Sequence, residues 1–218
     1  MKIPSNILSK YKTFDPEADL FFSEFNEDVG GRVLEVGSQH SPIASMLSEM
    51  GFSVVGVDLR DSDQECNYLH IKSDFCKMPR DFYTNIGQFD IAISISAIEH
   101  FGLNTYGEGP YRRYYDVVAM RKIYDFLRPG GVCYITVPFG GKYVENNPHW
   151  RVYDYASFLE RIVQDFSIEV FFTQVCENLF INGRDYKAGE KIDVGATLLN
   201  IYGFPNISCF AKLRKPLS

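Results

Sequence analysis

The chain has 218 residues, 45% of them apolar and 15% aromatic, with a formal net charge of −6 at pH 7. This length and apolar share predict one folded domain over residues 1–218 and exclude intrinsic disorder. The negative charge makes nucleic acid a poor candidate partner, and no apolar run reaches the length needed to cross a membrane.

The cysteines and the first residues indicate the cellular compartment. Five cysteines lie far apart without a C-x-x-C pattern, which favours reduced thiols over disulfides or structural zinc. The segment 1–12 is polar and mixed, unlike a secretory leader. We therefore expect a cytoplasmic protein, and we expect no metal site.

The first predicted element is a helix over residues 16–28 that packs on the edge of the sheet. Asp15 can cap it and Gly30-Gly31 can end it. Its apolar face is formed by Ala18, Phe21, Phe22 and Phe25. Residues 1–14 are predicted to be a loose lead-in, so that 1–30 forms an N-terminal helical cap that covers the core or lines a ligand entrance.

The next segment has the order strand, glycine turn, helix, strand and acid. Apolar strands are predicted at 32–36 and 53–57, with a helix over 42–50 between them. Gly37 and Asp58 follow the two strands, at the carboxyl ends where parallel sheets bind ligands. A ligand can approach the backbone at Gly37 because it has no Cβ, and Asp58 can accept hydrogen bonds from a ribose diol.

The glycine turn lacks the G-x-G-x-x-G fingerprint of dinucleotide sites. Gln39 and Ser41 stand where that fingerprint has glycines, and Glu35 lies two residues before Gly37. An anion beside the ligand suits a cationic or zwitterionic cofactor better than a pyrophosphate. An ordinary α/β domain with one tight turn is the alternative interpretation.

Two further strands end in groups that suggest a ligand site. A strand over 68–72 ends at Asp74-Phe75, which could hold an adenine or form a surface turn. A continuously apolar strand over 89–96 runs into Glu99-His100. His100 could take a proton from a hydroxyl because imidazole titrates near neutral pH, or this pair could only fix the loop by hydrogen bonds.

The second half contains two loops with aromatic and basic side chains. Residues 104–115 are rich in glycine, tyrosine and arginine, which is typical of a substrate lid. A helix follows and is predicted to stop at Arg128-Pro129-Gly130-Gly131, before a fifth strand over 132–137. Residues 138–155 form the second candidate substrate loop.

The C-terminal part adds a helix and two strands. Phe158, Leu159 and Ile162 indicate one more amphipathic helix, and 168–175 and 207–212 are predicted to be an antiparallel edge pair. The segment 176–203 gives no prediction. The whole order predicts an α/β fold: a doubly wound, mostly parallel, Rossmann-like sheet in a three-layer sandwich with an antiparallel C-terminal edge.

The ordered motifs over residues 30–215 resemble class I S-adenosylmethionine (SAM) methyltransferases. The motifs are Val33-Leu34-Glu35-Val36-Gly37, Val57-Asp58, Ser73-Asp74-Phe75, Phe89-Asp90 with Ile98-Glu99-His100, and Leu127-Arg128-Pro129-Gly130-Gly131. The longer run Ser96–Leu103 with Tyr106-Gly107, Asn147, His149, Arg151 and Tyr153 is similar to a less characterised bacterial, methyltransferase type 11-like branch.

The resemblance implies SAM as cofactor and assigns residues to it. Those near its amino-acid part would be Glu35, Gly37, Ser38, Ser94 and Ser96. Asp58 would bind the ribose, Leu59 would lie against the adenine, and Asp74 with Phe75 would hold the adenine edge. Gln39 and Ser41 depart from the glycines of the family.

Methyl transfer needs a nucleophile placed in line with the methyl group, and a hydroxyl acceptor also benefits from a base. His100 or His149 is the predicted base. The candidate acceptor pocket comprises Tyr106, Tyr111, Tyr143, Trp150 and Tyr153, which suit a sugar or an aromatic ring. A phosphate or carboxylate on the acceptor would be held by Arg112, Arg113 or Arg151, and ordinary packing is the alternative for each of these side chains.

The resemblance loosely implies O-methylation of a small-molecule acceptor such as a sugar or glycan precursor or a natural product. Two other readings remain open: a methyltransferase-like subunit without activity and a nicotinamide oxidoreductase. An aminopropyl transferase would use the same fold, but the tyrosine-arginine loop gives no sign of an acidic polyamine site. The absent dinucleotide fingerprint disfavours the oxidoreductase. Neither nucleic acid nor membrane is an expected partner, and a homodimer is left open.

Overall fold

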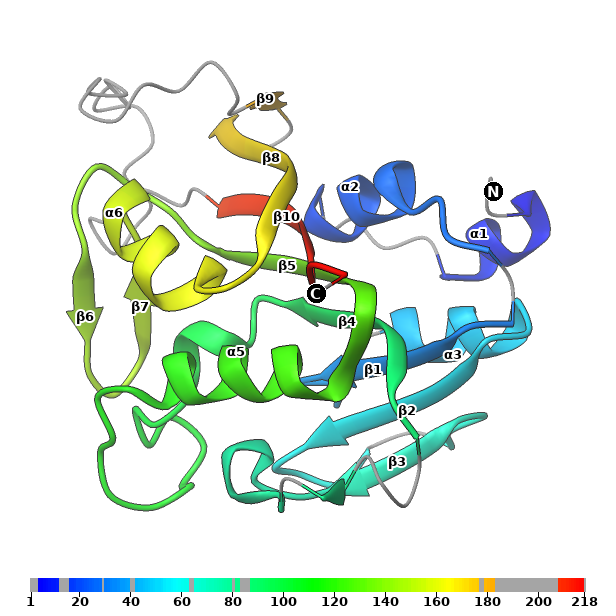
Figure 1. The fold of residues 1–218 in the computed structure, drawn as a ribbon, viewed down its shortest axis with the longest axis horizontal. Helices are drawn as coiled ribbons and strands as arrows, with labels where there is room; N and C mark the ends of the chain where they lie inside the picture. Colours follow the sequence, from blue (N-terminus) through cyan, green and yellow to red (C-terminus); the bar gives the residue numbers. More distant parts are fainter. Residues whose placement is uncertain are drawn as a thin grey trace.

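The fold is organised around one extended β-sheet (Figure 1). The computed structural model describes residues 4–11, 16–28, 30–39, 42–62, 65–79, 81–82, 87–176, 179–182 and 208–217. Within these residues the sheet has eight strands in the order β3-β2-β1-β4-β5-β10-β8-β9.

Five neighbouring strands form the parallel part of the sheet. They are β1 (Arg32–Val36), β2 (Ser53–Asp58), β3 (Leu69–Lys72), β4 (Phe89–Ile95) and β5 (Leu127–Pro138). Helices α3 (Ile43–Glu49) and α5 (Tyr115–Phe126) connect strands of this part. Strand order reverses direction at β1, where β2 lies on one side and β4 on the other, and such a switch point opens a crevice at the carboxyl ends.

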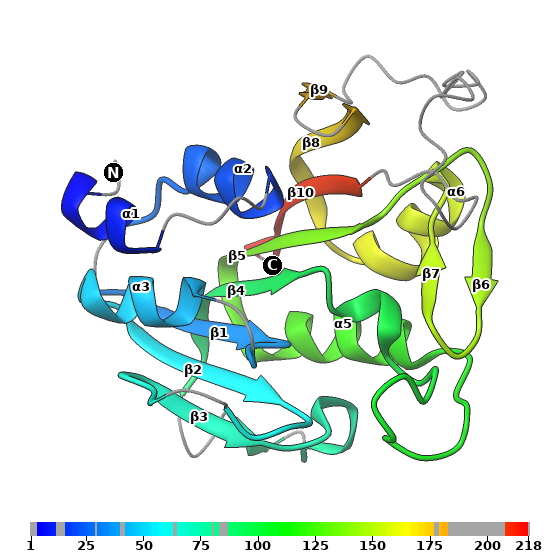
Figure 2. The same ribbon diagram turned by 180° about the vertical axis from the view of Figure 1, so that it is seen from behind.

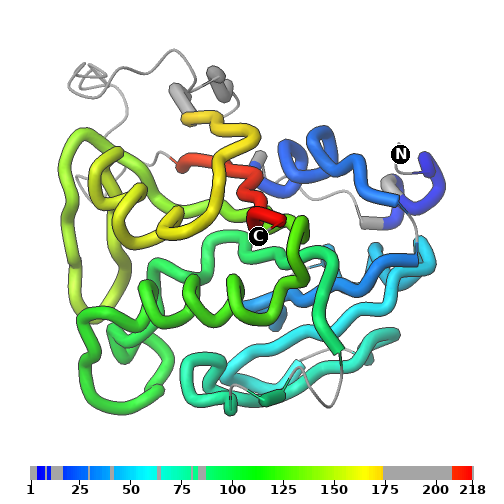
Figure 3. Tube along the Cα trace, in the orientation of Figure 1, coloured from blue at the N-terminus to red at the C-terminus, as the bar shows by residue number. Residues whose placement is uncertain are grey.

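The remaining strands are antiparallel. β10 (Ser208–Arg214) pairs with both β5 and β8 (Ser167–Cys176), and β9 (Leu179–Asn182) pairs with β8. Figure 3 shows the red C-terminal strand lying between the chain of β5 and the yellow chain of β8. The predicted antiparallel C-terminal region is confirmed, but β10 is an internal strand instead of an edge strand.

Helices cover both faces of the sheet (Figures 1 and 2). One face carries α5 and α6 (Tyr155–Ser157), which continues into a π-helical segment, Phe158–Val163. The other carries α1 (Ser5–Tyr11), α2 (Pro16–Glu24) and α3. Alternation along the strands explains both layers, since Leu34 packs with the α5 side whereas Val33 packs with the α2 and α3 side. The predicted three-layer, doubly wound fold is confirmed.

The predicted helix stop is confirmed, since α5 ends at Phe126, but the residues predicted to form a turn before the fifth strand belong to that strand. Arg128-Pro129-Gly130-Gly131 is part of β5, which begins at Leu127 directly after α5. Gly130 N donates to Lys215 O at 3.0 Å, and Lys215 N donates to Gly131 O at 2.9 Å. The C-terminal segment therefore pairs with this stretch and extends the strand.

Two predicted irregular segments contain regular structure. Helix α1 lies within the predicted lead-in 1–14. The predicted loop 138–155 contains a hairpin of β6 (Val144–Asn146) and β7 (Trp150–Val152). Each of these strands has three residues, too few for an apolar alternation to be visible in the sequence. No helix in the described ranges is long and apolar enough to cross a membrane.

Candidate functional site

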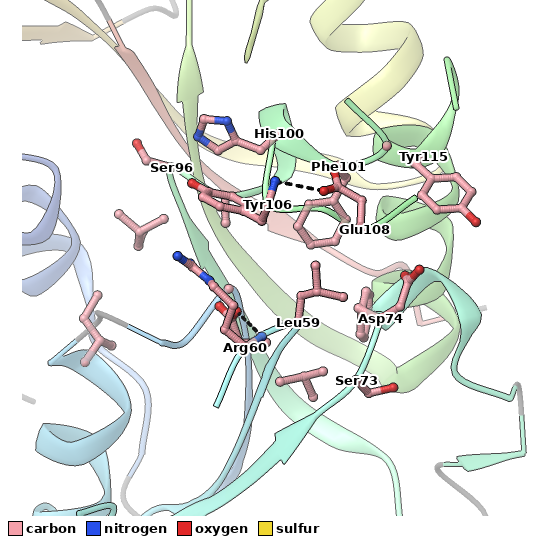
Figure 4. A pocket seen from close by; sticks show the side chains of 18 of the residues that line it. Leu59, Arg60, Ser73, Asp74, Ser96, His100, Phe101, Tyr106, Glu108 and Tyr115 are labelled. Atoms are coloured by element: carbon pink, nitrogen blue, oxygen red, sulfur yellow. Dashed lines mark hydrogen bonds and ion pairs between the residues drawn. The ribbon is translucent and has the colours of Figure 1, made fainter. Parts of the chain in front are cut away.

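A cavity of about 280 Å³ opens at the carboxyl ends of β1, β2 and β4 (Figure 4). Eight residues predicted for the site line it: Gly37, Asp58, Leu59, Asp74, Phe75, Ser96, His100 and Tyr106. They come from turns that follow four different parallel strands. The switch point of the sheet therefore brings them together.

The main chain at Gly37 approaches the opposite wall of the cavity closely. Gly37 has a φ of +86°, and a Cβ placed on it would lie 2.4 Å from the Cβ of Ala97. Gly37 N donates to Val57 O at 2.9 Å, which fixes the turn against β2. Any larger residue at this position would enter the space between the turns after β1 and β4.

We expect Gly37→Ala to lower the free energy of unfolding by more than the cost of the backbone conformation alone. A positive φ costs an L-residue about 1–2 kcal/mol, and the contact with Ala97 adds to this. Gly107→Ala is the matched control, because Gly107 has a φ of +77° but no atom within 4 Å of an added Cβ. Urea unfolding of both variants measures the difference, and equal losses would contradict the close approach.

Asp58 presents its carboxylate to the cavity from the end of β2. Its Oδ1 accepts from Arg60 N at 2.9 Å and from Arg60 Nε at 3.3 Å, and its Oδ2 accepts from Gln39 N at 3.2 Å. A carboxylate has about four acceptor positions. Asp58 is thus held rigidly by main-chain donors and still has capacity for one hydroxyl.

The turn after β3 is fixed by Asp74 and by a buried lysine. Asp74 accepts from Cys76 N at 3.0 Å and pairs with Lys77, and Lys122 Nζ donates to Phe75 O at 3.1 Å and to Cys76 O at 2.7 Å. The Phe75 ring packs edge-on against Phe126 in the core. The polar side chains that this turn offers to the cavity are Ser73 and the Asp74 carboxylate.

His100 follows β4 and faces the cavity (Figure 4). Its Nδ1 lies 2.5 Å from the carbonyl oxygen of His149. A carbonyl can only accept, so Nδ1 carries the proton and Nε2 has a free lone pair. Burial lowers the pKa of His100, and the hydrogen bond to His149 partly offsets this. The imidazole is neutral near pH 7 and can accept a proton at Nε2.

The neighbouring Glu99 is almost completely buried. Its Oε1 lies 3.7 Å from His100 Nε2, and its Oε2 has no hydrogen-bond partner among the described residues. Burial raises the pKa of Glu99 well above its usual range. Burial therefore favours the neutral form of this carboxyl group, which carries no negative charge beside His100.

Helix α2 closes one side of the cavity through Ala18. The preceding Glu17 holds the helix in place, since its Oε2 accepts from Ser96 Oγ and Thr136 Oγ1, both at 2.5 Å, and its Oε1 accepts from Ser208 Oγ. The N-terminal helix is thereby tied to β5, to β10 and to the residue after β4. This fits the predicted role of the cap at the ligand entrance.

Three residues predicted to meet the cofactor do not line the cavity. Glu35, Ser38 and Ser94 are all buried. Ser94 Oγ donates to Val36 O at 3.0 Å, and Ser38 Oγ lies 3.5 Å from His70 Nδ1. The structure places these hydroxyls in the sheet beneath the turns. Ser41 lies outside the described residues.

Three of the predicted acceptor residues bind Glu145 of the β6–β7 hairpin and do not line the cavity. Glu145 accepts from Tyr111 OH at 2.5 Å, from Tyr143 OH at 3.3 Å and from Arg151 Nε at 3.0 Å. Tyr153 is fully buried, with its hydroxyl donating to an acid of α5. In this arrangement these side chains hold the hairpin against the loop after β4.

Arg112, Trp150 and the His149 ring also lie outside the cavity lining. Arg112 lies over the ring of Tyr115, and the rings of His149 and Trp150 pack at a tilt with centroids 5.5 Å apart. His149 therefore contributes its main-chain carbonyl to the site. Within the described residues, no group of three His, Cys, Asp or Glu side chains is arranged to hold a metal ion.

Two charged residues of the lining were not predicted: Arg60 and Glu108. Arg60 lies two residues after Asp58, and its guanidinium is 4.1 Å from the centroid of the Tyr106 ring. Glu108 accepts from Asn104 N and Tyr106 N at 2.8 and 3.0 Å, which shapes the loop that carries Tyr106. The position of Arg60 beside a strand-end acid was the signal that could have found it.

Solved structures share the fold of the chain. A 1,6-didemethyltoxoflavin-N1-methyltransferase of Burkholderia thailandensis with bound S-adenosylhomocysteine has a TM-score of 0.60 at 14% identity, over 97% of this chain and 81% of its own. An O-methyltransferase of a trans-AT polyketide synthase of Brevibacillus brevis, in complex with S-adenosyl-L-homocysteine, has a TM-score of 0.62 at 12% identity, over 97% and 75%. The [4+2]-cyclase SpnF has a TM-score of 0.58 at 15% identity, over 92% and 80%.

These likenesses show that the chain has the class I methyltransferase fold. The comparison with curated proteins found no match. A family described as "Caenorhabditis protein of unknown function, DUF268" matches residues 39–184. This match begins at the turn after β1 and includes every strand from β2 to β9. It covers more than half of the sequence, so the chain belongs to the DUF268 family.

Proposed function

We propose that this protein transfers a methyl group from SAM to a small-molecule acceptor. The observation that carries the proposal is the cavity itself, where the Gly37 main chain, the Asp58 carboxylate and the Asp74 turn meet at the switch point of the sheet. The B. thailandensis and B. brevis proteins of the same fold hold S-adenosylhomocysteine. The fold alone does not decide the reaction, since the cyclase SpnF shares it.

The residues of the cavity fit SAM. Gly37 lines the cavity and has no side chain, so a ligand could lie against its backbone, and the remaining acceptor position of Asp58 suits a ribose hydroxyl. Leu59 and the Asp74 turn would hold the adenine, and Ser96 would lie toward the methionine part of the cofactor. When bound, SAM supplies a methyl group on a sulfonium, which is a good leaving group.

His100 would take the proton of an acceptor hydroxyl. Its Nδ1 is held by the His149 carbonyl, which orients Nε2 as the accepting atom. Tyr106 packs edge-on against His100, with ring centroids 5.6 Å apart, and provides an apolar wall. A sugar or an aromatic natural product carrying a hydroxyl suits such a wall, so we propose O-methylation.

Calorimetric titration with SAM tests the cofactor assignment. We expect Asp58→Asn to weaken SAM binding by about 10- to 100-fold, because a charged acceptor is lost from a hydrogen bond in the cavity. Asp61→Asn is the control, since the Asp61 side chain is 72% exposed and pairs with Lys72 outside the cavity.

The outcomes of this titration separate the candidate functions. Micromolar binding that is lost in Asp58→Asn and kept in Asp61→Asn supports the proposal. Binding of NAD in place of SAM would favour a nicotinamide oxidoreductase. Absence of any nucleoside binding would favour a methyltransferase-like subunit without activity.

A further inference from the structure

Arg60 is the one Lys or Arg residue among the described parts of the chain that lines the cavity. It follows β2, two residues after Asp58, and its side chain is 34% exposed. Figure 4 shows its guanidinium end directed toward Tyr106 and toward the part of the cavity that carries Ser96. A positive charge therefore faces the space in which an acceptor would lie.

Two contacts fix the orientation of the Arg60 guanidinium. Its Nε donates to Asp58 Oδ1 at 3.3 Å, and its Cζ lies over the Tyr106 ring, 4.1 Å from the centroid. Its terminal nitrogens, Nη1 and Nη2, make no hydrogen bond to another described residue. The contacts with Asp58 and with the Tyr106 ring hold the guanidinium so that these two nitrogens face a ligand as a pair. Paired N–H donors of this kind recognise carboxylate and phosphate groups.

The acids that line the cavity are each bound to donors of the protein. Asp58 accepts from Gln39 N and from Arg60, and Asp74 accepts from Cys76 N and pairs with Lys77. Glu108 accepts from two main-chain N–H groups of its own loop. Because these acids already accept from other donors, they leave the terminal N–H groups of Arg60 open to a ligand.

The arginines that the sequence indicated for an anion do not reach this space. Arg151 is fully buried, and its Nε, Nη1 and Nη2 donate to Glu145 and to main-chain carbonyls of Glu99, Phe101 and Arg113. Arg112 and Arg113 lie outside the lining. Recognition of an anionic acceptor in the cavity therefore depends on Arg60.

We propose that Arg60 binds a carboxylate or phosphate group of the acceptor, so that the protein selects acidic acceptors over neutral ones of the same shape. The acceptor would extend from Arg60 along Tyr106 to His100, since the Tyr106 ring contacts both side chains. This inference rests on the proposed function for the identity of the ligand as an acceptor. The anion site itself is formed by residues of the protein and does not require a bound cofactor.

Two isosteric pairs of probes test the selection: 4-hydroxybenzoate with 4-hydroxybenzamide, and glucuronate with glucuronamide. The members of each pair differ in charge and hardly in shape. Dissociation constants are measured by calorimetry at low salt, with and without S-adenosylhomocysteine. In the wild type we expect the acid of at least one pair to bind about tenfold or more tightly than its amide.

Variants at Arg60 and Arg112 test which arginine causes the preference for the acid over the amide. Arg60→Met keeps an unbranched apolar stem and removes the charged guanidinium, so the acid and the amide should bind equally. Arg60→Lys keeps a point charge and should retain a smaller preference. Arg112→Met removes an exposed charge outside the cavity and should keep the full preference. Thermal unfolding checks that each variant is folded.

Inorganic phosphate gives a measurement that needs no variant. If Arg60 holds the anion, phosphate displaces the acid from the wild-type protein and leaves the amide bound. Equal binding of acid and amide in both pairs, or a preference that survives in Arg60→Met, would overturn the inference. The probes are also measured on the protein alone, so the test of Arg60 does not depend on the cofactor. Failure of S-adenosylhomocysteine to bind would therefore contradict the cofactor assignment and leave the result for Arg60 standing.

Discussion

Replacing Asp116 by Asn is expected to lower the free energy of unfolding by about 3–5 kcal/mol, the usual cost of breaking a buried ion pair. Asp116 is fully buried in α5. Its Oδ2 accepts from Tyr153 OH at 2.9 Å and from Arg161 Nε at 2.8 Å, and its Oδ1 accepts from Arg161 Nη2 at 2.7 Å. The neutral amide would leave the buried Arg161 without a countercharge.

Asp125→Asn on the same helix is the control for this prediction. Asp125 pairs with Arg121 at 3.7 Å near the surface, and such pairs contribute only about 0–1 kcal/mol. Denaturant unfolding of both variants gives the comparison. Similar small losses in the two would show that the buried network contributes little to stability.

The Asp116 network also supports the cavity. Arg161 Nη2 donates to Arg113 O at 2.7 Å, and Arg151, beside Asp116, donates to Phe101 O at 2.7 Å. These two carbonyls lie at the ends of the loop that carries Tyr106. The network therefore fixes the loop at both ends while its middle remains at the cavity.

His100→Ala is expected to reduce kcat by about 10²- to 10⁴-fold on a hydroxyl acceptor, the usual contribution of a general base. The affinity for S-adenosylhomocysteine should change little, since the proposed ribose contact is made by Asp58 on a different strand. His149→Ala should cost less than about tenfold, because it keeps the main-chain carbonyl that orients His100. A larger effect at His149 than at His100 would refute this assignment of the base.

The expected pH dependence of kcat follows from the titration of His100. The neutral imidazole accepts the proton, so activity is present above the pKa of His100 and is lost as pH falls through it. Burial lowers the pKa of His100 from its usual 6.5. The acidic limb of the kcat profile should therefore lie below pH 6.5 in the wild type and be absent from the residual activity of His100→Ala.

The parallel part of the fold could be predicted from the sequence because its apolar runs are continuous and separated by clear turns. β1, α3 and β2 occur within one or two residues of their predicted positions. The site residues Asp58 and His100 were found for the same reason, since a polar residue directly after a buried strand must lie at the sheet edge.

The acceptor residues could not be placed in this way. The sequence shows that Tyr111, Tyr143 and Arg151 are able to bind a ligand, but it does not show that Glu145 accepts from all three. That contact depends on the short β6–β7 hairpin, which has no apolar pattern. The Phe89-Asp90 motif was also uninformative about chemistry, since Asp90 accepts from Arg32 N at 2.7 Å at the end of the sheet away from the cavity.

The internal position of β10 constrains the order in which the protein can be assembled. β5 and β8 are both complete long before residues 208–214 leave the ribosome, yet neither can gain its β10 ladder until then. A nascent chain at that stage carries an unpaired β5 edge with a buried, apolar pattern, which is the kind of edge that aggregates. Synthesis of β10 therefore converts a vulnerable intermediate into a sheet in which this edge of β5 is paired.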